Sequence, residues 1–204
     1  MLKPPLRHFI TIFKSQLPFK QLSTKILKKI NLWQARNVKI RDNISLNTPY
    51  RESLPGNCGL ACVAMIVPDV KIETLVKRYK QPPYYLHPIG WTHKGLVEIL
   101  ADLNTHYQSK KYQTINQLIA YLSRGKPIIV SLRIPEANNV SNTKIYQAID
   151  SSQKKTGHLC ILTGVNNQGM ILNDPRNLLI YSQHTITPLS VFAQIFTGNC
   201  IIPK

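Results

Sequence analysis

The chain has 204 residues, 43% of them hydrophobic, and carries 26 Lys and Arg against 9 Asp and Glu, a formal net charge of +17. This composition allows one good-sized core and requires no second large domain. No apolar run approaches the length of a membrane span, and the apolar stretch at residues 9–13 is too short for the core of a secretory signal. We therefore expect a cytosolic protein, or one delivered to the cytosol of a host cell, with its four cysteines reduced.

Residues 1–44 hold ten basic residues and one acidic residue, about half of the excess charge. Apolar residues at helical spacing predict a basic amphipathic helix around Gln21–Trp33. Such an extension could lie on an anionic membrane surface, contact nucleic acid or pack on its own domain. We expect residues 45–204 to form one α+β domain.

Helices dominate the first half of this domain. An apolar helix is expected over Asn57–Ile66, because the residue before Pro68 disfavours helical geometry. Thr114 and Gln117 form a capping-box pattern that opens another helix, and Gly125 ends it. The other expected elements are a helix containing Ile72, Leu75 and Val76, an irregular loop over 81–91, a helix over 92–103 and a strand over 126–132.

Strands dominate the second half. Residues 135–156 are polar and lack apolar periodicity, so they are expected to form a long connection that could cover a site. The run 158–165 and the run 170–172 predict a hairpin around the turn at 166–169. A strand at 178–182, a helix opened by Thr187 with Pro188 in its first turn, and a closing strand over 200–202 complete the expected fold.

Cys58 follows a Gly-containing loop, in the run Pro-Gly-Asn-Cys-Gly-Leu-Ala-Cys, and lies on the first turn of its helix. Unpaired backbone N–H groups and the helix dipole there lower the pKa of a thiol. Cys58 is therefore a candidate nucleophile.

His158 and Asp174 supply what a thiol nucleophile needs. His158 stands at the entrance of an apolar strand, and Asp174 ends the partner strand within Asn-Asp-Pro. The hairpin would bring the carboxylate beside the imidazole, where it could fix the tautomer and orient the ring.

The order Cys, then Gly-His opening a strand, then Asn-Asp-Pro resembles the papain-like cysteine peptidases of the bacteriocin-processing, C39-like type, over roughly residues 45–204. Those domains trim double-glycine leader peptides. The resemblance implies a papain-like fold with an N-terminal nucleophile helix on an antiparallel sheet. It also implies a thiol protease with a peptide or protein substrate, a Cys58–His158–Asp174 catalytic triad and no metal or other cofactor.

One position departs from that pattern. Relatives carry a Gln six residues before the nucleophile as an oxyanion donor, and this chain has Glu52 there. An ionised carboxylate would repel the oxyanion, and loss of one donor can cost about 3 kcal/mol of transition-state stabilisation. The candidates to complete the oxyanion hole, beside the backbone N–H of Cys58, are Asn57, Arg51, Asn47 and a protonated Glu52.

Several alternatives stay open in the sequence. The same triad serves acyl transfer and deamidation, and Glu52 could instead mark a peptide-binding domain that does not cut. Cys58, Cys62, His158 and Cys160 could ligate zinc, although packing is the expected role of Cys62 and the spacing of the other residues is not that of a usual zinc knuckle. The residues that could grip an extended peptide are Trp91, Tyr84 and Tyr85.

Overall fold

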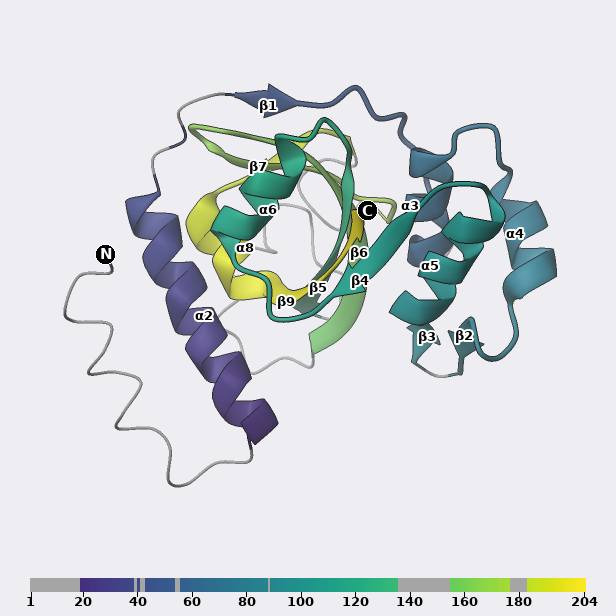
Figure 1. Ribbon diagram of the computed structural model, residues 1–204, viewed down its shortest axis with the longest axis horizontal. Helices are drawn as coiled ribbons and strands as arrows, with labels where there is room; N and C mark the ends of the chain where they lie inside the picture. The colour runs from purple at the N-terminus through teal and green to yellow at the C-terminus, as the bar shows by residue number, and fades with distance from the viewer. Residues whose placement is uncertain are drawn as a thin grey trace.

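The computed structural model describes residues 19–38, 40, 43–53, 56–87, 89–135, 155–176 and 183–204. Within these residues the protein is built on one curved antiparallel sheet (Figure 1). The strands follow the order β4-β9-β5-β6-β7-β8, and β1 pairs with β6. Their bounds are β1 (Ile44–Ser45), β4 (Tyr107–Lys110), β5 (Ile128–Pro135), β6 (Lys155–Asn166), β7 (Gly169–Asn173), β8 (Thr185–Thr187) and β9 (Phe196–Pro203).

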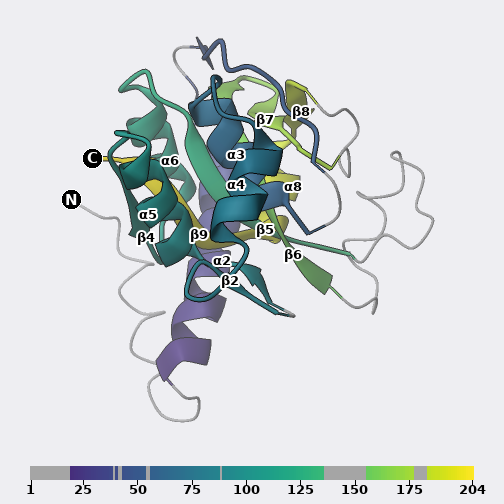
Figure 2. The same ribbon diagram turned by 90° about the vertical axis from the view of Figure 1, so that its right-hand side faces the viewer.

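Helices lie on both sides of this sheet. Figures 1 and 2 show α3 (Cys58–Ile66), α4 (Ile72–Tyr79) and α5 (His93–Asp102) grouped on one side. On the other side lie α2 (Phe19–Asn37), α6 (Ile115–Leu122) and α8 (Leu189–Ile195). A small separate pair, β2 (Tyr85–Leu86) and β3 (Gly90–Trp91), connects α4 to α5.

The alternation of side chains along the strands divides the interior into two clusters. Ile129 on β5 lies opposite Ile161 and Ile201, and all three belong to the cluster beneath α3, α4 and α5. The next residue, Val130, lies opposite Cys160 and Cys200 in the cluster beneath α6 and α8. Because both faces are covered, these strands are continuous apolar runs rather than alternating ones.

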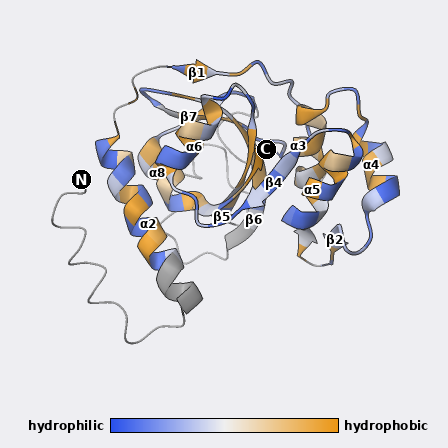
Figure 3. Cartoon of the chain, viewed as in Figure 1, coloured by the Kyte–Doolittle hydropathy of each residue, from blue (hydrophilic) through white to orange (hydrophobic). Residues whose placement is uncertain are grey.

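Helix α3 is buried along most of its length, and Figure 3 colours it largely as hydrophobic, whereas α4 carries hydrophilic residues. The α+β class, with the helix that begins at Cys58 packed on an antiparallel sheet, is confirmed. The capping box of α6 is also present, with the Thr114 side chain accepting a hydrogen bond from the backbone of Gln117.

Three expectations differ from the structure. The strand β4 was not expected, because the polar side chains of its sequence, Tyr-Gln-Ser-Lys, carry no strand signal. The loop over 81–91 contains the short pair β2–β3. Thr187 does not open α8: it is the last residue of β8, and the N-cap residue of α8 is Pro188, which has no side-chain hydroxyl. The expected strand at 178–182 and most of the connection over 135–156 lie outside the described residues.

Helix α2 extends further than the expected Gln21–Trp33 and packs on the domain. Leu27 and Asn31 are buried, and Asn31 Oδ1 accepts a hydrogen bond of 3.0 Å from the Ile115 N–H at the start of α6. Among the helices described, none is both long enough and apolar enough to cross a bilayer.

Candidate active site

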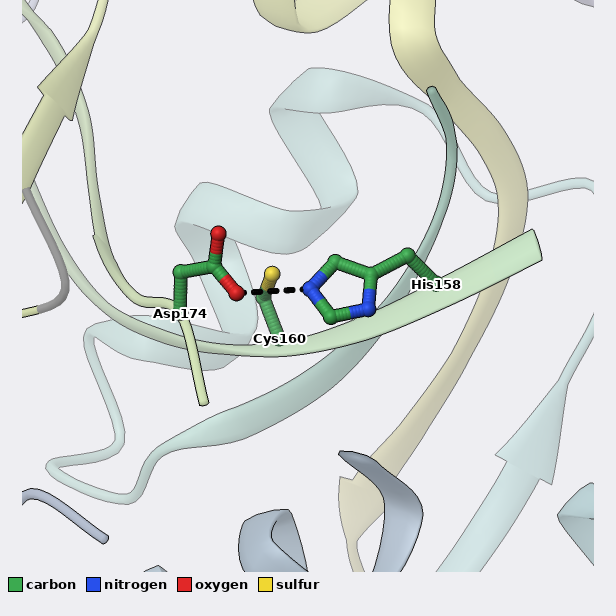
Figure 4. A group of neighbouring side chains, drawn as sticks. All are labelled: His158, Cys160 and Asp174. Carbon is green, nitrogen blue, oxygen red and sulfur yellow. Dashed lines mark hydrogen bonds and ion pairs between the residues drawn. The ribbon is translucent and has the colours of Figure 1, made fainter. Parts of the chain in front are cut away.

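His158 and Asp174 meet at one end of the β6–β7 hairpin. Strand register sets Ile161 opposite Asn173, so Asp174 follows β7 diagonally across from His158. His158 Nε2 and Asp174 Oδ1 are 2.6 Å apart, and both side chains are fully buried (Figure 4). The hairpin therefore brings the two residues together as the sequence predicted.

Further hydrogen bonds hold the Asp174 carboxylate and the backbone of residues 174 and 175. The backbone N–H of Arg176 donates to Asp174 Oδ1 at 3.0 Å. The Tyr50 hydroxyl donates to the Asp174 carbonyl at 3.3 Å, and the Ser53 N–H donates to the Pro175 carbonyl at 2.7 Å. These bonds tie the segment that leads into α3 to the end of β7.

Cys58 is the first residue of α3 and the only partly exposed cysteine, because Cys62, Cys160 and Cys200 are buried. Burial alone would raise the pKa of the Cys58 thiol. Hydrogen bonding to His158, the charge of His158 and a hydrogen bond with the Leu159 backbone outweigh it, so the pKa lies below its ordinary value. Cys58 is therefore the thiol most readily ionised, whereas burial raises the pKa of both Cys160 and Cys200 to about 12.

The two nitrogens of His158 differ in their surroundings. Nε2 is bonded to Asp174, whereas Nδ1 is buried and has no aligned hydrogen-bond partner among the described residues. The thiol of Cys58 is near enough for hydrogen bonding to the ring to lower its pKa. Thiol–imidazole contacts of this type are often long or poorly aligned before a substrate binds. Of the two ring nitrogens, Nδ1 is thus the one that the bond to Asp174 does not occupy.

The pKa of His158 is raised well above its usual range. Burial opposes the charged imidazolium, but the neighbouring Cys160 sulfur, the hydrogen bond to Asp174 and the contact with Cys58 favour it. A cationic ring beside an ionisable thiol is the arrangement that an activated cysteine requires.

Cys160 is a third group at this pair, and the sequence suggested it only as one member of a possible zinc site. Its sulfur lies beside the His158–Asp174 bond, and one ligand atom from each of the three side chains lies within 4.8 Å of the others (Figure 4). Period-two alternation would have found it, because residues 158 and 160 of one strand share a face. The 2.6 Å bond is a direct N–H···O contact, which a metal ion bound between the two atoms would have to open.

Trp91 packs against the segment that precedes and begins α3. Only 7% of Trp91 is exposed, and its Nε1–H donates to the Gly56 carbonyl at 2.9 Å. A Cβ at Gly59 would approach the Trp91 Cβ to 2.9 Å, so only glycine fits there. Tyr84 and Tyr85 are partly exposed, and their rings contact Tyr79 and Trp91, respectively.

The oxyanion candidates lie in different places. Arg51 donates to the Pro68 carbonyl at 3.2 Å, beyond the far end of α3. Glu52 and Asn47 are exposed. Asn57 directly precedes Cys58 as the N-cap residue of α3, and its side chain makes no capping hydrogen bond.

A second histidine contact was also not expected. His93 Nε2 and Ser131 Oγ are 2.6 Å apart, joining the start of α5 to β5. Burial and the charge of Lys111 lower the pKa of His93. No sequence signal links two residues 38 positions apart on different elements.

Several solved structures with a similar fold are peptidases or peptidase domains. The chain is 15% identical to a putative C39-like peptidase from Bacillus anthracis, covering 80% of this chain and 98% of that one with a TM-score of 0.55. It is 20% identical to the peptidase domain of Streptococcus ComA, a bifunctional transporter, covering 77% and 98% with a TM-score of 0.53.

A third similar structure is a double glycine motif protease from an AMS/PCAT transporter, in complex with its leader peptide. It is 15% identical, with coverage of 80% and 100% and a TM-score of 0.54. No curated protein sequence matches the chain. The model of the Peptidase C39 like family matches residues 43–198. Because this match spans most of the chain, the protein belongs to the Peptidase C39 like family.

Proposed function

We propose that the protein is a cysteine peptidase in which Cys58 is the nucleophile, His158 the general base and acid, and Asp174 the residue that orients the imidazole. The observation that carries this proposal is the buried 2.6 Å bond between His158 Nε2 and Asp174 Oδ1, which leaves Nδ1 for the Cys58 thiol. Membership in the family supports the same reaction class.

The reaction begins from a thiolate–imidazolium pair, which the lowered pKa of Cys58 and the raised pKa of His158 both favour. The Cys58 sulfur attacks the peptide carbonyl carbon and the carbonyl oxygen becomes an oxyanion. The imidazolium then protonates the leaving amine as the C–N bond breaks, which leaves a thioester on Cys58.

Hydrolysis of the thioester completes the cycle. His158 takes a proton from water, the hydroxide oxygen bonds to the acyl carbon, and the C–S bond breaks to release a carboxylic acid. We assign the backbone N–H of Cys58 and the Asn57 side chain as oxyanion donors. Asn57 is the candidate that directly precedes Cys58 in the chain, and its side chain is not used in capping.

The proposed substrate is a peptide or protein segment bound in extended form. One of the similar structures contains a leader peptide, which supports a peptide as the substrate class here. The same thioester could pass to an amine or arise from a side-chain amide, so the first test must distinguish these products.

The test is incubation of the protein with a complex peptide library in water enriched in oxygen-18. We expect new peptide ends that carry the heavy oxygen, detected by mass spectrometry. Cys58→Ser and His158→Ala should abolish them, whereas His106→Ala, a matched change at an exposed histidine, should not. Unbroken peptides that have only exchanged an amide for an acid would instead assign a deamidase.

A second test needs no substrate. At slightly acidic pH, a mild alkylating agent should modify Cys58 before Cys62, Cys160 and Cys200, because only Cys58 combines exposure with a lowered pKa. The measurement is peptide mapping of the labelled protein. Equal labelling of Cys58 in wild type and His158→Ala would show that the imidazole does not activate the sulfur.

A further inference from the structure

Helix α2 has two sides with different environments. One side is buried on the domain through Leu27 and Asn31, and Gln34 Oε1 accepts a hydrogen bond of 3.2 Å from the Asn116 N–H. The opposite side is in solvent, where Lys25, Lys28 and Arg36 are exposed. At about 100° per residue, these three side chains and Trp33 fall in one sector roughly opposite Leu27.

Trp33 is an exposed aromatic residue within this basic sector. Its exposure is 55%, compared with 7% for Trp91, the other tryptophan of the chain. A large aromatic surface left in water among basic side chains is typical of helices that lie in the headgroup layer of a membrane.

The charge on this side is not neutralised by the elements beneath it. Helix α2 contains no acidic residue, and α6, α8 and β9, on which it packs, contain no charged residue. In Figure 1, α4 and α5 lie on the other side of the sheet from α2. The acidic residues at described positions belong to that helical side and to the active site: Glu52, Asp69, Glu73, Glu98, Asp102 and Asp174.

We propose that the outward side of α2, formed by Lys25, Lys28, Trp33 and Arg36, binds the anionic surface of a lipid bilayer. The basic side chains lie against acidic headgroups, and the Trp33 indole enters the headgroup layer. Because the apolar side of α2 is occupied by the domain, the binding is peripheral and reversible rather than an insertion of the whole helix.

A bilayer fits this surface better than nucleic acid does. The sector is the convex side of a single helix, and it has lysines and one arginine rather than a groove with paired amide or guanidinium groups that could read bases. Docking through α2 would turn α3, α4 and α5 away from the membrane, because they lie across the sheet from α2 (Figure 1). This inference does not depend on the proposed peptidase activity.

The experiment is flotation of the full chain with vesicles of neutral phosphatidylcholine or of phosphatidylcholine containing phosphatidylserine. We expect binding to the acidic vesicles only, weakening as salt rises. The triple variant Lys25→Ala, Lys28→Ala, Arg36→Ala should bind on the order of 100-fold more weakly, since each basic residue near such a surface contributes roughly fivefold.

The matched control removes three exposed lysines across the sheet, Lys71→Ala, Lys77→Ala and Lys80→Ala. It lowers the net charge equally but should retain binding. If both triple variants lose vesicle binding to the same extent, overall charge rather than this side of α2 determines binding, and the proposal is wrong. Circular dichroism of each variant verifies that it is folded.

Tryptophan fluorescence gives a direct probe of the membrane contact. Trp33 emission should shift to shorter wavelength on addition of acidic vesicles, and brominated lipids should quench it, while Trp33→Phe should lose the response. Absence of any shift, or binding to a short DNA or RNA duplex with no binding to vesicles, would overturn the proposal. If the protein cleaves peptides but does not bind the vesicles, the membrane proposal is wrong and the proposed peptidase function is unaffected.

Discussion

The two ring nitrogens of His158 have different surroundings. Asp174 bonds Nε2 and favours the cationic ring, whereas Nδ1 has no aligned partner among the described residues and is the nitrogen that we assign to the Cys58 thiol. Cys160 lies beside the His158–Asp174 bond, and all three side chains are buried, so the bond is shielded from bulk solvent.

At this scale, Asp174→Asn should change the pH dependence of cleavage. Between the lowered pKa of Cys58 and the raised pKa of His158, the thiolate–imidazolium pair is populated, so the rate rises through the first and falls through the second. Removing the carboxylate lowers the pKa of His158 and should move the alkaline limb to lower pH. The measurement is kcat/KM against pH, and an unmoved alkaline limb would contradict the assigned role.

Trp91 gives a second prediction for a single residue. Trp91→Phe keeps an aromatic ring under Gly59 but removes the donor to the Gly56 carbonyl. Loss of this bond should cost about 1 kcal/mol of unfolding free energy and lower kcat more than it raises KM, because the loop before Cys58 is less well held. Tyr85→Phe, a matched change in the ring that contacts Trp91, should have a smaller effect on kcat.

Among the elements, β6 joins the site to the rest of the sheet, since it pairs with β5, β7 and β1. The pairing with β1 depends on Gly164, where a Cβ would lie 2.1 Å from the Ile44 carbonyl oxygen. The chain runs from β1 to the segment that contacts Asp174 and Pro175, and then into α3. A substitution at Gly164 that displaces β1 should therefore also disturb the position of Cys58.

Gly164→Ala tests this connection. It should lower the unfolding free energy by about 1–3 kcal/mol through the enforced clash, and should also reduce cleavage. Gly157→Ala is the matched control on the same strand, because a Cβ there would meet nothing within 4 Å. Denaturant titration of both variants gives the comparison, and equal destabilisation would argue against the clash as the cause.

For the whole molecule, α2 is part of the folded unit, because Leu27 is only 7% exposed and lies against Gly198 of β9. Leu27→Ala should lower the unfolding free energy by about 2–3 kcal/mol in a single transition, whereas Lys28→Ala on the exposed side should change it by less than about 0.5 kcal/mol. The measurement is unfolding followed by Trp91 fluorescence in a Trp33→Phe background, where Trp91 is the only tryptophan. Because Trp91 lies on the opposite side of the sheet, it reports whether the whole domain loses stability with α2. A separate early transition of α2 would contradict one cooperative unit.

Local patterns were sufficient to predict most of the elements and the His158–Asp174 contact. The Gly-containing loop before Cys58, the capping box at Thr114 and the turn at 166–169 are each determined by residues close in sequence. The hairpin then fixes by register which side chains meet, so the long separation of His158 and Asp174 was no obstacle.

Contacts between distant elements could not be predicted in the same way. The position of Trp91 beneath Gly56, the His93–Ser131 bond and the direction of Arg51 toward Pro68 depend on how α3, α5 and β5 pack. Strand β4 was missed because its pairing with β9, rather than its own residue pattern, makes it a strand.

Strand β9 lies between β4 and β5, although it is the last strand in the chain, and its Ile201 contributes to the cluster beneath α3. During synthesis on the ribosome, the first strands of the sheet must wait for residues 196–203 to emerge before β4 and β5 can be joined. The nascent polypeptide therefore contains Cys58, His158 and Asp174 before it has the scaffold that holds them. The proposed peptidase activity would therefore be acquired only after β9 has been synthesised.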